Sequence, residues 1–118
     1  APPAAPKPAA PAAATLRPTR PGLRVRLTKI YLDYAPKAMS GLVSALESED
    51  FASIKLLAHS LKSSSANVGA DSMAELCKAL EMAAEGGNLA DAQQLVAEVQ
   101  AQLDGDIHRM RTELEMSA

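Results

Sequence analysis

Apolar residues recur at helical spacing along most of the chain from residue 23 onward. Residues 36–47 show the pattern most simply, with Met39, Leu42, Val43 and Leu46 at positions i, i+3, i+4 and i+7. This spacing places the side chains on one face of an α-helix, where they can pack against a core. The same periodicity predicts a short helix over residues 23–34, a helix over residues 51–68 and two further helices toward the C-terminus.

The residues between these segments are typical of helix ends. Pro36 predicts a break after the short helix, or the first turn of the next one, because proline lacks a backbone N–H. The other expected boundaries are a cap by Ser48 or Asp50, a left-handed Gly69, a capping box of Ser72 and Glu75, a stop at Gly86-Gly87 and a cap by Asn88. Gly105 falls inside the last helix and could bend it. Short connections between amphipathic helices predict an all-α, antiparallel up-down four-helix bundle with a short additional N-terminal helix.

The domain organisation follows from the distribution of proline. Seven of the eight prolines lie in residues 1–21, which are also rich in alanine and unsuited to a packed core. We therefore interpret residues 1–21 as a Pro/Ala-rich linker or tail and residues 22–118 as the helical domain. A semi-rigid tether to an upstream domain is the favoured interpretation of the linker.

Composition and charge exclude several classes of function. The chain has 118 residues, no Trp, one Phe and two Tyr, so nothing indicates a base-stacking surface. Residues 22–118 carry nine Lys and Arg against fourteen Asp and Glu, which argues against a nucleic-acid-binding protein. No apolar run is long enough to span a membrane. Cys77 is the only cysteine, so no internal disulfide is possible and a cytoplasmic location is expected.

The most distinctive residue is His59 in the predicted helix over residues 51–68. Winding this segment at about 100° per residue places His59 roughly 150° from the centre of the apolar face, and therefore toward solvent. Lys55 lies four residues before His59 and Lys62 three residues after it, on the same exposed face. Two cations favour the neutral, nucleophilic imidazole and would stabilise a phosphoryl group in transfer. Small neighbours leave room for a partner protein to approach.

Other interpretations of His59 fit the sequence less well. A metal site is unexpected, since no His or Cys lies at i±3 or i±4 and zinc needs three or four ligands. No carboxylate on the same helix could orient the ring for a hydrolase, and no nucleophile elbow is present. A solvated surface histidine is the plain alternative, but Ser63-Ser64-Ser65 is a poor choice for helix stability alone.

A wider set of residues resembles a known family. His59, Lys62, the stretch Ser64-Ser65-Ala66-Asn67-Val68-Gly69-Ala70, and then Leu76-Cys77 and Leu80-Glu81 are similar to the pattern of histidine-containing phosphotransfer (HPt) domains. The resemblance extends upstream through Tyr31-Leu32 and Pro36 and covers residues 23 to 115. One departure is Ser63, because family members usually carry Gly directly after the lysine.

The resemblance implies a phosphorelay intermediate of a two-component system. By resemblance, His59 accepts a phosphoryl group from a receiver aspartate and passes it to another receiver, and Lys62 stabilises the phosphoryl charge. The expected receiver-docking residues are Lys55, Leu56, Ser63, Ala66 and Asn67. The domain itself is expected to bind no metal or cofactor, the required Mg²⁺ being in the partner receiver.

Further expectations concern the parent protein and its partners. No glycine-rich nucleotide motif is present, so the domain is not expected to be an autonomous enzyme. A bacterial hybrid sensor histidine kinase with this domain at its C-terminal end is the expected parent. The domain is then cytoplasmic, tethered to a membrane-bound sensor but without direct membrane contact, and monomeric in isolation. The alternative function is a non-catalytic helical module that docks partners through the same exposed face.

Overall fold

The computed structural model describes residues 21–117, and within this range it contains four α-helices and no strand. The helices are α2 (Pro21–Glu47), α3 (Phe51–Asn67), α4 (Asp71–Glu85) and α5 (Leu89–Ser117). Residues 1–20 of the predicted linker lie outside the described residues. None of the described helices is both long enough and apolar enough to cross a membrane.

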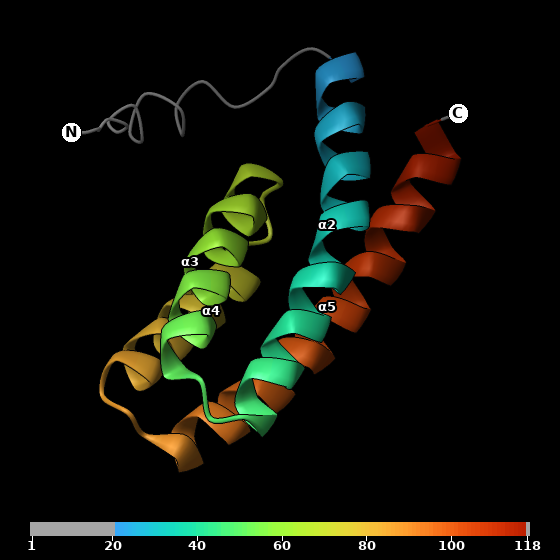
Figure 1. Ribbon diagram of the computed structural model, residues 1–118. Helices are drawn as coiled ribbons and strands as arrows, with labels where there is room; N and C mark the ends of the chain where they lie inside the picture. Colours follow the sequence, from blue (N-terminus) through green and yellow to red (C-terminus); the bar gives the residue numbers. More distant parts are fainter. Residues whose placement is uncertain (1–20, 118) are drawn as a thin grey trace, which may run out of the picture.

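The four helices form an antiparallel up-down bundle, as predicted. Figure 1 shows α2 and α4 running in one direction and α3 and α5 in the other. Packing is closest between α3 and α4, and each of α2 and α5 packs against the other and against one helix of this pair. The largest fully buried side chains come from all four helices and are aliphatic apart from one tyrosine: Tyr31, Leu42, Ile54, Leu61, Met73, Leu80, Val99 and Leu103.

The short additional N-terminal helix is not a separate element, so that part of the prediction is wrong. Residues 23–34 form the first half of α2, which continues through Pro36 without interruption. A proline inside a helix costs one hydrogen bond and crowds the preceding turn, at about 3 kcal/mol. Pro36 itself is exposed, whereas Ala35 and Ala38 on either side of it are buried in the core. Burial of α2 on both sides of Pro36, from Tyr31 to Ala45, offsets the local cost.

Most of the predicted helix ends are confirmed. The carboxylate of Asp50 accepts a hydrogen bond from the backbone N–H of Ser53, at 3.1 Å, and caps α3. Asn88 caps α5 through the N–H of Asp91, and Gly69 has the expected positive φ of 77°. The capping box at Ser72 is wrong, because α4 begins at Asp71 and its N-cap is Ala70, two residues before Ser72, which makes no side-chain cap hydrogen bond. Gly105 does not interrupt α5.

Candidate functional site

His59 lies midway along α3 and projects from the bundle. Its side chain is 61% exposed, whereas Ala58 and Leu61 beside it are fully buried. The amphipathic spacing of α3 alone is sufficient to direct His59 outward, because its apolar stripe must face the core. The predicted orientation of His59 is confirmed.

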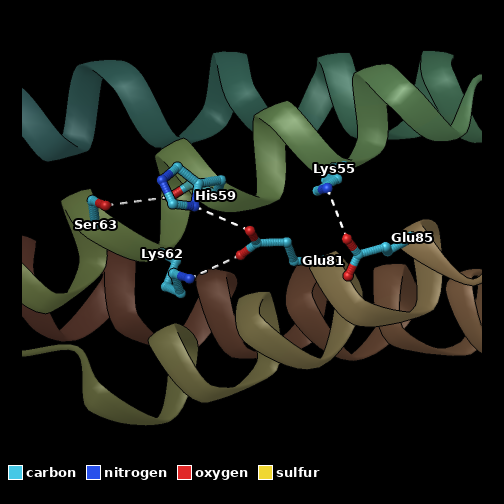
Figure 2. A network of polar contacts seen from close by, with 6 residues as sticks. All are labelled: Lys55, His59, Lys62, Ser63, Glu81 and Glu85. Carbon is cyan, nitrogen blue, oxygen red and sulfur yellow. Dashed lines mark hydrogen bonds and ion pairs between the residues drawn. The ribbon is translucent and has the colours of Figure 1, made fainter. Parts of the chain in front are cut away.

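A carboxylate from the neighbouring helix α4 contacts the imidazole. Glu81 Oε2 lies 3.1 Å from His59 Nδ1, and Glu81 Oε1 accepts a hydrogen bond of 2.8 Å from Lys62 Nζ. Figure 2 shows Glu81 between these two side chains, with the second ring nitrogen on the far side of the imidazole. The sequence analysis considered only carboxylates on the helix of His59 and therefore missed this contact. Glu81 is 22 residues away in sequence, and antiparallel packing of α3 and α4 brings it into contact.

The electrostatic environment keeps Glu81 ionised near neutral pH. Burial acts to raise the pKa of Glu81, but the hydrogen bond and charge of Lys62, followed by those of His59, outweigh it and lower the pKa below its usual 4.5. An ionised carboxylate is only an acceptor of hydrogen bonds. His59 Nδ1 must therefore carry the proton, and in the neutral imidazole this leaves Nε2 with its lone pair free.

The two lysines that flank His59 both face glutamates of α4. Lys55 Nζ lies 3.0 Å from Glu85 Oε2, one helical turn from the Glu81 contact (Figure 2). The side chains of this pair are 44% and 67% exposed, so the pair contributes little to stability. Lys55 is therefore part of the rim of the site, whereas Lys62 shares a carboxylate with His59. The two cations predicted to act on His59 are each partly neutralised.

Sequence comparison assigns the family. The family model described as the Hpt domain matches residues 26–113, which is more than half of the chain. The chain belongs to the Hpt domain family. Among solved structures, the fold is similar to that of the histidine-containing phosphotransfer protein B (HptB) from Pseudomonas aeruginosa PAO1, with a TM-score of 0.80 and 24% sequence identity over 91% of this chain and 93% of that chain. No curated protein sequence gave a significant match.

Membership of the family defines the coarse function. Hpt domains are phosphotransfer intermediates of two-component signalling that exchange phosphoryl groups with receiver domains, and they are carriers, not autonomous enzymes. Within residues 21–117 of this Hpt domain, no three His, Cys, Asp or Glu side chains are grouped so that they could hold a metal ion.

The residues predicted to dock a receiver share the outward side of α3. Leu56 is 71% exposed, Ala66 and Asn67 are also exposed, and Ser63 donates a long hydrogen bond of 3.4 Å to the carbonyl of His59. The sequence analysis did not single out Met82, which directly follows Glu81 and is 64% exposed. The docking role of these residues stays a prediction.

Other polar and titratable groups lie outside the site of this Hpt domain. Ser65 is buried, and its hydroxyl lies 2.8 Å from that of Tyr31 on α2. Cys77 is a buried core residue, and burial raises the pKa of its thiol to about 12. His108 is exposed, but Asp106, two residues before it, is only 3% exposed, which the sequence did not indicate.

Proposed function

We propose that this Hpt domain accepts a phosphoryl group on Nε2 of His59 from the phosphorylated aspartate of a response-regulator receiver, and passes it to the aspartate of another receiver. The supporting observation is the exposed imidazole whose Nδ1 contacts the ionised Glu81. This contact directs the lone pair of Nε2 away from the bundle, toward the side from which a partner would approach.

The proposed transfer forms the Nε2–P bond while the bond between phosphorus and the aspartate oxygen breaks, and the aspartate leaves as a carboxylate. No proton needs to move, because Nδ1 keeps its proton and the phosphorylated ring becomes a cation. Glu81 would stabilise this cation through the contact at Nδ1. Lys62 has three ammonium donors, of which the hydrogen bond to Glu81 uses one, so the others can bond the phosphoryl oxygens.

Lys55, Leu56, Ser63, Ala66 and Asn67 would form the receiver-docking surface. Their side chains are mostly small, and together with the exposed Leu56 they would let the receiver's acidic pocket approach His59 closely. Mg²⁺ would be held by the receiver and not by this domain. We further propose that the domain is monomeric and forms the C-terminal, cytoplasmic part of a hybrid sensor histidine kinase.

The decisive experiment uses the two histidines of the chain. The domain is mixed with Mg²⁺ and a receiver carrying labelled phosphate on its aspartate, and the product is tested for phosphate that is stable to alkali and labile to acid. We expect label on the wild type and on His108→Gln, whose ring is exposed on α5, and none on His59→Gln. Circular dichroism checks that both variants keep the bundle.

Two results would contradict the proposal. Label retained by His59→Gln would show that another residue accepts the phosphoryl group. Binding of receivers without any transfer, and without dependence on His59, would support the alternative of a non-catalytic interaction module.

A further inference from the structure

Helix α2 extends well beyond the end of α3, and no other helix among residues 21–117 covers one face of its first turns. In the lower part of the bundle this face packs against α3, with Gly41 next to Leu57. Figure 1 shows the first turns of α2 continuing past the last turn of α3. Leu23, Leu27, Ile30 and Tyr34 continue the face at helical spacing, and Ile30 is 59% exposed and Leu23 38% exposed. We call these four residues the α2 stripe.

A hollow marks the corner where the α2 stripe meets the end of α3. It has a volume of about 90 Å³ and lies between Leu27, Ile30 and Tyr34 of α2, Ser64 and Asn67 of α3, and Val68 directly after α3. Ligand pockets for small molecules measure about 300 Å³ or more, so this hollow suits a single side chain. The geometry is that of a notch that an apolar side chain of a partner could enter.

The charge around the α2 stripe is strongly positive. Residues 21–32 contain three cations and no Asp or Glu, whereas residues 33–118 contain six Lys and Arg and fourteen Asp and Glu. The three cations, Arg24, Arg26 and Lys29, are exposed in the first turns of α2 beside the stripe. Cations near a helix N-terminus oppose the helix dipole, and no acidic residue in the first turn compensates them. An anionic partner would relieve this repulsion.

Three other occupants fit the notch less well. A second copy paired about a two-fold axis would bring its own Arg24, Arg26 and Lys29 against the same cations. Residues 1–20 of this chain are a poor occupant as well, because they carry three cations and no acid and could not neutralise the cations of α2. A flat lipid surface cannot follow the α2 stripe, because the end of α3 lies beside α2 where the stripe ends (Figure 1).

We propose that the α2 stripe binds an acidic amphipathic helix of a partner protein. The apolar residues of the partner helix would cover Leu23, Leu27 and Ile30, so that this helix would continue the line of α3 along α2. The carboxylates of the partner helix would pair with Arg24, Arg26 and Lys29. The site adjoins Ser64 and Asn67, so such a helix would lie beside the face that presents His59. The proposal does not depend on phosphotransfer.

A synthetic peptide tests this surface directly. The probe is a fluorescent helical peptide with leucines at i, i+3, i+4 and i+7 and glutamates elsewhere, and its control has the same composition with scrambled leucines. Fluorescence anisotropy with the full chain should show saturable binding of the probe and much weaker binding of the control. Added salt should weaken binding, since the cations are exposed.

Matched variants locate the site. Ile30→Ser and Arg26→Glu should each weaken binding of the probe by about tenfold, equivalent to about 1.4 kcal/mol. Val43→Ser, at an exposed apolar position lower on α2, and Lys78→Glu, at an exposed lysine of α4, should leave it nearly unchanged. Circular dichroism confirms that each variant folds.

The proposal is overturned if the scrambled peptide binds equally well, or if the two pairs of variants behave alike. Self-association detected by light scattering, lost in Ile30→Ser, would assign the stripe to a second copy instead. Sedimentation with anionic phosphatidylglycerol vesicles, lost in Arg26→Glu, would assign it to a membrane.

Discussion

Replacing Glu81 by glutamine isolates the role of its charge at His59. Glutamine keeps the shape of the side chain, but it can present either an oxygen or an NH₂ group to Nδ1 and carries no charge. The amide therefore neither fixes the proton on Nδ1 nor stabilises the cation that forms when Nε2 is phosphorylated. We expect Glu81→Gln to fold, to bind receivers and to accept the phosphoryl group more slowly.

The structure sets the expected size of the effect. A hydrogen bond to a charged group contributes about 1.5–3 kcal/mol. The lower end applies here, because the contact is 3.1 Å long and the side chain of His59 is 61% exposed. A loss of about 1.5 kcal/mol in the transition state corresponds to a transfer rate about tenfold lower.

The assay is single-turnover transfer of labelled phosphate from the receiver, paired with ¹⁵N NMR of the imidazole. The wild type should show a protonated Nδ1 and an unprotonated Nε2 when the ring is neutral, and Glu81→Gln should show a mixture of tautomers. Glu85→Gln is the matched control, because it removes only the exposed pair with Lys55 and should change the rate little. Wild-type transfer rate and wild-type nitrogen shifts in Glu81→Gln would refute the positioning role of Glu81.

The same pair of proteins gives a pH prediction for folding. The pKa of Glu81 is lowered in the folded state, so its contribution to stability is present above the unfolded value of 4.5 and is lost as the pH falls through the folded value. The free energy of unfolding should therefore be higher for the wild type than for Glu81→Gln at neutral pH. Urea denaturation at a series of pH values should show this difference shrinking below about pH 4.5. A difference that grows in acid would contradict the assigned direction.

Three further predictions concern the scaffold and are checked by urea or thermal denaturation. Tyr31→Phe removes the buried hydrogen bond to Ser65 and should lower the free energy of unfolding by about 1–2 kcal/mol. Adding Ser65→Ala to this variant should recover part of the loss. If the losses of the two single variants simply add in the double variant, the prediction is contradicted. Asp50→Ala should destabilise the domain by removing the cap of α3, and the difference should vanish as the pH falls through the lowered pKa of Asp50. Gly105→Ala should stabilise α5 by about 1 kcal/mol because its Cβ meets open space, whereas Gly41→Ala should gain less because its Cβ would lie 3.1 Å from Leu57 Cδ1.

The sequence predicted α3 and its functional face well because one local pattern determines both. The expected range of residues 51–68 differs from the observed helix by one residue, and Ile54, Leu61 and Ser65 are buried as their spacing required. The orientation of His59 needed no knowledge of the neighbouring helices, only that the apolar stripe faces inward. The helix caps at Asp50 and Asn88 were predictable for the same reason, since a cap is a contact between residues three apart.

Features that depend on two packed elements were not predictable in this way. The continuity of α2 through Pro36 results from burial of the residues on both sides of the proline. The local helix preferences of the sequence carry no information about this burial. No local pattern distinguishes Asp106 from the other charged residues of α5, yet Asp106 is buried. Its Oδ2 has no hydrogen-bond partner among the described residues. Its burial depends on which side of α5 turns toward α2, and the spacing of a long helix with weak amphipathicity does not specify that.

Glu81 shows how such a feature changes the chemical interpretation of a site. From the sequence, the lysines at 55 and 62 explained a neutral imidazole, and Glu81 was only one residue of the family pattern, with no contact assigned to it. In the bundle, Glu81 neutralises part of the charge of Lys62 and contacts Nδ1 itself. The free Nε2 is then explained by hydrogen bonding and not by repulsion between cations. Because the contact joins α3 to α4, the reactivity of His59 depends on the rotation and stagger of these two helices, which makes their close packing a functional requirement as well as a structural one.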